Sequence, residues 1–215
     1  MENDSKLTTI YLVRHGQTKA NAEEIVAGHF DSPLTPVGEQ QAQSRKDSLK
    51  DVHFDAVFSS DLVRAKRTAE IIATDRQLAV NTTHLIRERF FGNWEGKPIS
   101  EFVEANKKLF DLQKKLSEDQ HHEFKPYSEY ESNNEIADRM LIFLREVAAT
   151  YITKTVLVVA HGSIMRSTLM RLGFAKTYEL PAGCIENTGY VVLESDGVDF
   201  FIKETVGVNK REIEN

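Results

Sequence analysis

The sequence TIYLVRHG at residues 9–16 decides the fold class, because a short apolar run ends abruptly in polar residues. Continuous apolar, β-branched and aromatic residues are typical of a strand that is buried on both faces of a sheet. A second run of the same kind, TVLVVAHGS at residues 155–163, also ends in His-Gly and leads into apolar residues at helical spacing. Two buried strands that each end in His-Gly predict an α/β domain with parallel strands.

Strand and helix patterns alternate between these two runs. Thr35-Pro36 is a typical helix start, with proline at the first helical position. Residues 55–60 predict a strand, apolar residues between 65 and 72 predict a helix, and residues 82–86 predict a further strand. Near the carboxyl end, residues 190–202 predict a β-hairpin. We therefore expect a three-layer α/β sandwich with a mostly parallel sheet.

A stretch of different composition interrupts this alternation. Residues 100–120 are rich in Lys, Glu and Gln and predict one amphipathic helix, whereas the polar segment 117–134 predicts a loop. The apolar residues of the helix are Phe102, Ala105, Leu109, Leu112 and Leu116. Helical periodicity returns between Ile136 and Tyr151. We treat residues 1–215 as one domain with a helical insertion at about 97–135, whose apolar stripe packs in a lid or in a homodimer.

Composition excludes several classes of protein. Lys and Arg total 27 and Asp and Glu total 33, and the resulting net charge of −6 argues against a nucleic-acid partner. The single cysteine, Cys184, excludes a disulfide within the chain and fits a cytoplasmic location. Residues 1–9 are polar, and no apolar run approaches the roughly 20 residues that a membrane span requires. No membrane partner is expected.

The residues around the two His-Gly turns indicate an anionic ligand. Ligands of parallel sheets bind outside the carboxyl ends of the strands, so both turns are expected at one crevice. Arg14 precedes the first histidine, and Arg64 lies at the start of a predicted helix, where backbone N–H groups favour an anion. Guanidinium groups present paired donors to oxygen anions. The predicted ligand is a small phosphorylated metabolite.

Two side chains could carry the chemistry of phosphoryl transfer. A neutral imidazole such as His15 is a competent nucleophile toward phosphorus and forms a covalent intermediate that water later removes. The leaving alcohol then needs a proton. Glu88, which follows the predicted strand at 82–86, is the best acid and base candidate near the same sheet edge.

Five blocks of sequence, in order, resemble the histidine phosphatase superfamily, which includes the phosphoglycerate mutases. The blocks are RHGQTKAN (14–21), DSPLTPVG (31–38), SSDLVRA (59–65), RERFFGNWEG (87–96) and VAHG (159–162). They reach across most of the chain, and their order and spacing make the resemblance far more specific than one Arg-His-Gly triplet. The resemblance implies a phosphoglycerate-mutase-like fold.

The resemblance also implies roles for individual residues. His15 would be phosphorylated, and Glu88 would protonate the leaving group and then activate water. Arg14, Arg64 and His161 would hold the phosphoryl oxygens. The expected substrate-binding residues are Asn21, Gln17, Thr18, Gly162 and Arg89. Neither a metal nor another cofactor is implied.

Departures from the family pattern concern the substrate. Many family phosphatases carry Arg and Gln where this chain has Ile25 and Ala27, and two glycines where it has Glu129-Tyr130. The Arg-rich insertion that helps the mutases retain a bisphosphate has no counterpart between Gly96 and Ile136. The first two differences concern specificity contacts and the shape of the lid, and the third favours net phosphomonoester hydrolysis over intramolecular transfer. The resemblance implies that this hydrolysis is metal-independent. A phosphoglycerate mutase-type isomerase and a catalytically weak phosphate-ligand sensor are the alternatives.

Overall fold

The computed structural model describes residues 7–211, so most of the polar amino-terminal stretch lies outside it. The described chain forms one six-stranded sheet with the strand order β3-β2-β4-β1-β5-β6. The strands are β1 (Thr8–Arg14), β2 (Ala56–Ser60), β3 (Val80–Thr83), β4 (Thr155–Ala160), β5 (Ile185–Ser195) and β6 (Phe200–Val208). Strands β3, β2, β4 and β1 are mutually parallel, and the β5–β6 hairpin joins β1 in antiparallel fashion. The predicted mostly parallel sheet is confirmed.

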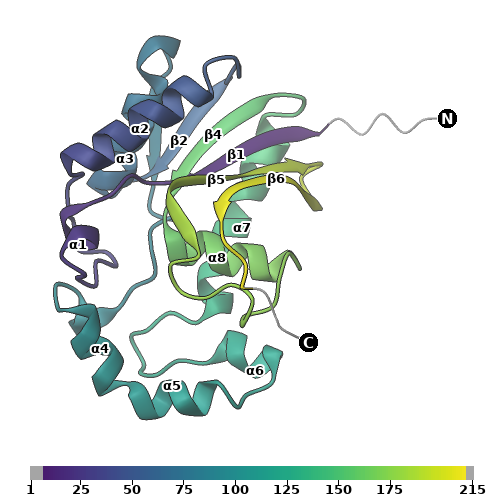
Figure 1. The fold of residues 1–215 in the computed structure, drawn as a ribbon. Helices are drawn as coiled ribbons and strands as arrows, with labels where there is room; N and C mark the ends of the chain where they lie inside the picture. The colour runs from purple at the N-terminus through teal and green to yellow at the C-terminus, as the bar shows by residue number, and fades with distance from the viewer. Residues whose placement is uncertain (1–6, 212–215) are drawn as a thin grey trace.

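Helices cover both faces of this sheet and give the expected three layers (Figure 1). The helices are α1 (Lys19–Ala22), α2 (Pro36–Ser48), α3 (Val63–Ala73), α4 (Ile99–Ala105), α5 (Lys107–Gln113), α6 (Glu118–Glu123), α7 (Asn133–Thr150) and α8 (Gly162–Arg171). Helices α2 and α3 lie on one side, and α7 and α8 lie on the other. Helix α2 begins as predicted, because the Thr35 hydroxyl accepts a hydrogen bond from the Gly38 N–H.

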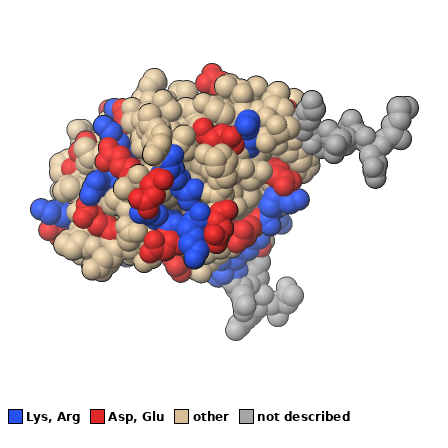
Figure 2. Space-filling view, turned by 90° about the horizontal axis from the view of Figure 1, so that it is seen from above, with Lys and Arg blue, Asp and Glu red and all other residues tan. Residues whose placement is uncertain are grey.

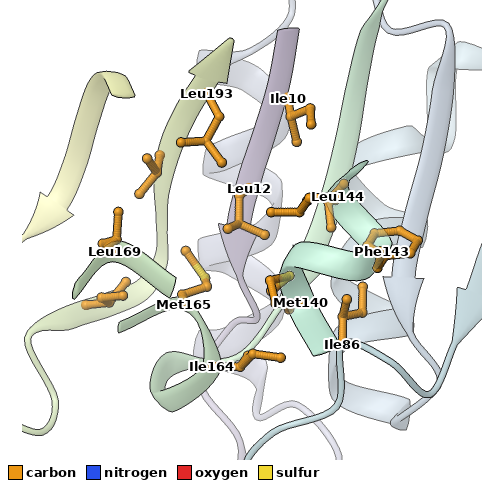
Figure 3. Close-up of a cluster of buried hydrophobic side chains, with 14 of the residues drawn as sticks. Ile10, Leu12, Ile86, Met140, Phe143, Leu144, Ile164, Met165, Leu169 and Leu193 are labelled. Carbon is orange, nitrogen blue, oxygen red and sulfur yellow. The ribbon is translucent and has the colours of Figure 1, made fainter. Parts of the chain in front are cut away.

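The two central strands are buried on both faces, as their continuous apolar sequences predict. Successive side chains of a strand point to opposite faces, so Ile10 and Leu12 of β1 join the core under α7 and α8, and Val13 joins the core under α2 and α3. Figure 3 shows the first of these cores, where Leu12 lies beside Met140 and Leu144 of α7. The sheet therefore holds the ends of β1 and β4 rigidly.

The predicted strand at residues 82–86 is shifted in the structure. Strand β3 pairs with β2 only from Val80 to Thr83, and the chain then turns. Ile86 is fully buried, but it packs in the α7–α8 core instead of pairing with a neighbouring strand. Ile86 is therefore apolar because it contributes to this core, and not because it belongs to a strand.

The insertion contains three short helices, and the single helix predicted over residues 100–120 is wrong. Helix α4 ends before Asn106, whose side-chain amide donates to the Phe102 carbonyl, and α5 follows directly. Leu112 is 53% exposed, so no core lies beneath it to favour a continuous helix. The loop predicted at residues 117–134 is also wrong in part, because α6 lies within it and begins with a capping box between Ser117 and Gln120.

Surface features agree with the composition. Lys and Arg side chains are interspersed with Asp and Glu on the face seen from above (Figure 2), so that face carries no extended basic surface. Among the helices of residues 7–211, none combines the length and the apolarity needed to cross a bilayer.

Candidate active site

His15 and His161 are neighbours because they follow two adjacent parallel strands. Arg14 at the end of β1 is in register with Ala160 at the end of β4, and the His15 N–H donates to the Ala160 carbonyl at 3.0 Å. The centroids of the two imidazole rings are 5.1 Å apart. Both side chains are buried. The structure thus brings the two His-Gly turns together at one edge of the sheet.

Hydrogen bonding defines the tautomer of His15. Its Nδ1 lies 2.7 Å from the Gly16 carbonyl oxygen, and because a carbonyl only accepts, Nδ1 donates and Nε2 carries the lone pair. Burial lowers the pKa of His15 well below its usual value, and the positive charges of Arg64 and Arg14 lower it further. His15 is therefore a neutral imidazole whose nucleophilic nitrogen is Nε2.

His161 has the opposite tautomer. Arg64 Nε donates to His161 Nδ1 at 3.2 Å, so the proton of the neutral ring lies on Nε2. Burial and the charge of Arg64 lower the pKa of His161 well below its usual value. Within residues 7–211 the buried Nε2 atom has no hydrogen-bond partner, so His161 presents an unused N–H donor.

Arg14 supplies a second unused donor. One of its terminal nitrogens donates to the Ile185 carbonyl, while its buried Nε has no partner among the described residues. A Cβ atom on Gly162 would lie 3.3 Å from this Nε, so the glycine leaves room beside the guanidinium. Leaving a buried donor unsatisfied costs about 1–3 kcal/mol. Two such donors at adjacent turns indicate a site for an acceptor with several oxygens.

Arg64 is built into the wall of this site. It lies in the first turn of α3 and is almost fully buried. Besides its bond to His161, its terminal nitrogens donate to the Phe30 carbonyl at 3.0 Å and to the Gly28 carbonyl at 2.6 Å. The loop that contains these carbonyls therefore fixes the guanidinium next to His161.

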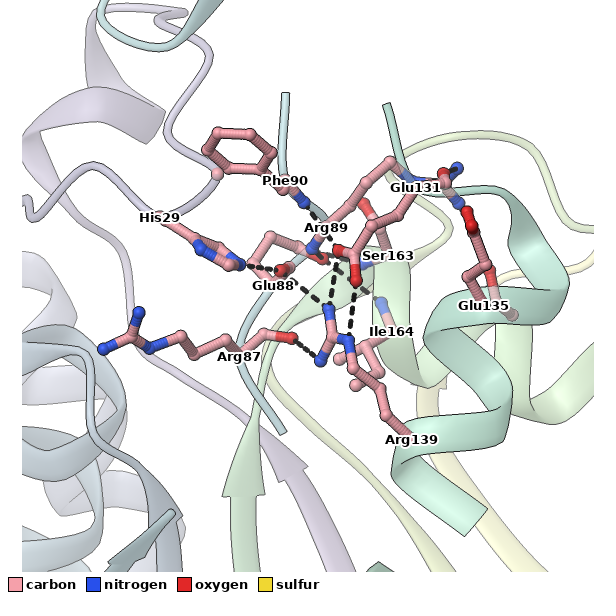
Figure 4. A network of polar contacts seen from close by, with 12 residues as sticks. His29, Arg87, Glu88, Arg89, Phe90, Glu131, Glu135, Arg139, Ser163 and Ile164 are labelled. Carbon is pink, nitrogen blue, oxygen red and sulfur yellow. Dashed lines mark hydrogen bonds and ion pairs between the residues drawn. The ribbon is translucent and has the colours of Figure 1, made fainter. Parts of the chain in front are cut away.

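Glu88 lies over the start of α8, where Ser163 and Ile164 follow the His161-Gly162 turn (Figure 4). Its Oε2 accepts from the Ser163 N–H at 3.0 Å, and its Oε1 accepts from the Ile164 N–H at 3.2 Å and from the Arg89 N–H at 2.7 Å. Burial lowers the pKa values of Arg14 and Arg64, and the nearby Glu88 carboxylate acts in the opposite direction. Glu88 follows a turn and not the end of the strand predicted at 82–86. Its carboxylate still lies at the sheet edge where β4 ends and α8 begins.

The loop after β1 packs tightly against the start of α2. A Cβ atom on Gly16 would overlap the Gly38 carbonyl oxygen. The predicted entrance residue Gln17 donates its backbone N–H to the Gln41 side chain, and its own side-chain oxygen accepts from Thr35 at 2.8 Å. The backbone and the side chain of Gln17 thus both attach the loop that carries His15 to the start of α2.

Thr18 and Asn21 form the capping box of α1. The Thr18 hydroxyl accepts from the Asn21 N–H, and the Asn21 side-chain oxygen accepts from the Thr18 N–H, both at 3.1 Å. Asn187, which no motif indicated, donates to this same Asn21 oxygen at 3.4 Å and to the His15 carbonyl at 3.1 Å. No local pattern indicated Asn187, which lies three residues before the predicted hairpin at 190–202.

Arg89 contacts the start of α7. Its terminal nitrogens donate to the Glu131 carbonyl and to the Asn133 side chain, both at 2.6 Å, and its guanidinium lies 4.7 Å from the centre of the Tyr130 ring. Tyr130 stands in the place where a glycine was expected. Substrate binding by Arg89 stays a prediction, and the contacts seen are structural.

Metal ligands do not gather in the described part of the chain. No group of three or more His, Cys, Asp or Glu side chains between residues 7 and 211 is placed to hold a metal ion.

Comparisons with known proteins agree with this architecture. A family model described as the histidine phosphatase superfamily (branch 1) matches residues 10–206. A Bacillus subtilis (strain 168) protein named uncharacterized phosphatase PhoE is 34% identical over 166 residues, which cover 77% of this chain and 78% of the relative. The crystal structure of phosphoglycerate mutase from Bacillus anthracis str. Sterne has a TM-score of 0.81 at 26% identity and covers 96% of both chains.

A third relative is known in complex with a small ligand. Phosphoserine phosphatase from Entamoeba histolytica, in complex with 3-phosphoglyceric acid, has a TM-score of 0.77 at 26% identity. The match covers 93% of this chain and 96% of that one. The expected phosphoglycerate-mutase-like fold is therefore confirmed.

Proposed function

Since the chain belongs to branch 1 of the histidine phosphatase superfamily and is a phosphatase of that type, we propose that it hydrolyses the phosphomonoester of a small metabolite through a phosphohistidine at His15. The observation that carries the proposal is the pair of buried donors Arg14 Nε and His161 Nε2, which have no hydrogen-bond partner among residues 7–211. The ring of His15, whose Nε2 carries the lone pair, lies 5.1 Å from the ring of His161. A phosphoryl group satisfies both donors while it presents its phosphorus to this lone pair.

The first chemical step transfers the phosphoryl group to His15. The Nε2 lone pair forms the bond to phosphorus as the bond from phosphorus to the ester oxygen breaks, and protonated Glu88 gives its proton to that oxygen. Arg14, Arg64 and His161 stabilise the negative charge of the transferring oxygens. The depressed pKa of His15 supports this role, because the lone pair stays available at neutral pH.

The second step regenerates the enzyme. Glu88, now a carboxylate, accepts a proton from water as the water oxygen attacks the phosphorus of phosphohistidine. The bond between phosphorus and Nε2 breaks, its electron pair returns to His15, and inorganic phosphate leaves. No step requires a metal or another cofactor in this proposal.

A small phosphorylated metabolite is the proposed partner, in the cytoplasm and without nucleic acid or membrane. The net charge of −6 and the single cysteine support these proposals. The insertion carries scattered lysines in place of an Arg-rich segment, which favours release of phosphate over its retention for isomerisation. Similarity to a phosphoglycerate mutase keeps isomerisation as the second candidate.

Phosphate release from a panel of small phosphomonoesters, measured in the presence of EDTA, tests the proposal. We expect turnover in the wild type, none in His15→Ala, and unchanged turnover in His53→Ala, which removes an exposed histidine. Rapid quenching should trap an acid-labile, base-stable phosphoprotein. Turnover that EDTA abolishes would contradict the proposed mechanism. Conversion of 3- to 2-phosphoglycerate that depends on added 2,3-bisphosphoglycerate, without net phosphate release, would favour the mutase.

A further inference from the structure

Arg139 of α7 contacts three backbone carbonyls around Glu88 (Figure 4). One terminal nitrogen donates to the Leu85 carbonyl at 2.9 Å and to the Arg87 carbonyl at 2.5 Å, and the other donates to the Glu88 carbonyl at 2.9 Å. An arginine on a neighbouring helix therefore holds the backbone on the amino-terminal side of Glu88 and at Glu88 itself.

Glu131 completes this arrangement from the other side. Its two carboxylate oxygens accept from Arg139 Nε and from a terminal nitrogen, both at 2.9 Å, which is the paired geometry typical of arginine and carboxylate. One of these oxygens also accepts from the Phe90 N–H at 2.8 Å. All five N–H donors of Arg139 are thus engaged, and the segment is fastened both before and after Glu88.

The segment depends on these contacts because it lies outside the sheet. Strand β3 ends at Thr83, so no strand ladder holds residues 85–90. A further side chain, His29, donates from Nε2 to the same Glu88 carbonyl at 2.8 Å. Side chains from outside the segment thus hold its backbone at Glu88, while the N–H groups of Ser163 and Ile164 receive the carboxylate at the start of α8, directly after His161 and Gly162.

We propose that Arg139 and Glu131 form a positioning pair that holds the Glu88 carboxylate where it can protonate the leaving group. The proposal rests on the function proposed above for His15 and Glu88. Arg139 acts through the backbone and touches no reacting atom, so it is a positioning residue. Its loss should impair proton delivery to the leaving group more than attack on phosphorus.

Leaving-group dependence separates this role from a general structural one. A p-nitrophenolate leaves without a proton, whereas the alkoxide of an alkyl phosphate needs one. Arg139→Lys keeps the charge but has only three donors and no planar pair. We expect its kcat/KM for the best alkyl phosphate of the panel to fall about 30- to 100-fold, which is a partial loss, up to the lower end of the roughly 10²- to 10⁴-fold that general acid catalysis contributes. With p-nitrophenyl phosphate the fall should stay below about threefold. The parameter kcat/KM is chosen because it reports the steps up to phosphoryl transfer.

Three further variants make the test decisive. Glu88→Gln should lose much more kcat/KM with the alkyl phosphate than with p-nitrophenyl phosphate, and this difference, called the split below, should be at least as large as in Arg139→Lys. Glu131→Gln should show it in milder form, because its amide oxygen still accepts one bond. Arg145→Lys, an exposed arginine on the same helix, should leave both substrates unaffected. Thermal melting of each variant identifies any that fails to fold, and Glu131→Gln then replaces Arg139→Lys.

The outcomes distinguish the two levels of the proposal. Equal losses with both substrates in Arg139→Lys and Glu131→Gln, or no loss with either, would overturn the positioning role if Glu88→Gln shows the split. Absence of the split in Glu88→Gln would instead overturn the acid role of Glu88, and the positioning role with it. A split in Arg139→Lys, Glu131→Gln and Glu88→Gln, with none in Arg145→Lys, supports the proposal.

Discussion

Arg64 Nε donates to His161 Nδ1 at 3.2 Å, and this one bond fixes both which nitrogen of His161 carries the proton and where it points. The same guanidinium is held by the Gly28 and Phe30 carbonyls. A buried cation thus orients a neutral imidazole so that its Nε2–H, like Arg14 Nε, has no hydrogen-bond partner among residues 7–211. The proposed anion site is organised by the protein's own contacts, which is the arrangement that stabilises developing charge most effectively.

Replacing Arg64 should disrupt this organisation. Arg64→Lys replaces the planar guanidinium by a compact ammonium group. The ammonium cannot donate to His161 and to the Gly28 and Phe30 carbonyls at the same time. We expect kcat/KM for phosphate release to fall about 10²- to 10³-fold, as when one oxyanion donor is lost. Arg67→Lys is the matched control, since Arg67 lies on the same helix and is half exposed. A loss below threefold in Arg64→Lys would contradict the role assigned to Arg64.

Stability should fall as the pH drops below about 6.5. The folded protein keeps His15 and His161 neutral because burial lowers their pKa values well below the usual one. The unfolded chain takes up protons at both positions once the pH falls below about 6.5, so it binds more protons than the folded state and is favoured. The equilibrium constant for unfolding should rise up to about tenfold per pH unit for each histidine.

Urea unfolding at pH 7.5, 6.5 and 5.5 measures this dependence. His161→Gln should remove up to half of it, since burial also lowers the pKa of His121. The amide oxygen of the glutamine can still accept from Arg64. His53→Gln, which changes an exposed side chain, should leave the dependence intact. If the stability of the wild type were constant over this range, the histidines would not be held neutral.

The sequence predicts the centre of this fold well because local patterns and burial agree there. Continuous apolar runs identified β1 and β4, and the helical spacing after Ile136 identified α7, since these segments pack on the core along their whole length. The two histidine turns converge for the same reason, because adjacent parallel strands end at one edge. Residue type and family order predict roles for Arg64 and Glu88, and the structure places them against His161 and the start of α8.

Tertiary contacts decide the parts that the sequence did not predict. Ile86 is apolar for packing and not for strand pairing. The insertion breaks at Asn106, where α4 and α5 share an aromatic cluster centred on Phe102 in place of a long apolar face. In the sequence, Arg139 and Asn187 do not differ from other polar residues. Only the fold places the Glu88 carbonyl next to Arg139 and the His15 carbonyl next to Asn187. No local pattern signals such long-range contacts.

Gly16→Ala should destabilise the protein and displace His15. The added methyl group would overlap the backbone carbonyl of Gly38, and backbone yields less easily than a side chain. We expect a loss of about 1–3 kcal/mol in the free energy of unfolding. Activity should fall more than in Gly96→Ala, because His15 directly precedes Gly16. Gly96→Ala is the comparison: its φ of +81° makes alanine strained, but no atom lies within 4 Å of the added Cβ.

Urea unfolding and phosphate release of both glycine variants are compared with the wild type. Gly96→Ala should lose about 1–2 kcal/mol from strain alone and keep its activity. Equal activity in the two variants would show that the loop carrying His15 adapts to the added methyl group.

Phe102→Ala should loosen the insertion without unfolding the domain. The Phe102 ring makes edge contacts with Phe91, Trp94 and Phe110, at centroid distances of 5.5–5.6 Å. It is the one buried side chain of α4, so its removal takes away most of the apolar packing that holds this helix. Deleting a buried phenyl ring typically costs about 3–5 kcal/mol. Because the insertion lies apart from the two cores of the sheet, this loss should appear as local opening.

Limited trypsin digestion detects such opening, since Lys107 and Lys114 lie in and next to α5. Cleavage at these lysines should be at least tenfold faster in Phe102→Ala, because a change of about 1.4 kcal/mol in a local opening equilibrium is tenfold in the population of the open form. Leu112→Ala is the matched control, since Leu112 is 53% exposed on the neighbouring helix. If both variants were cleaved at the wild-type rate while the midpoint of global unfolding fell in Phe102→Ala, the insertion would unfold together with the sheet and not as a separate lid.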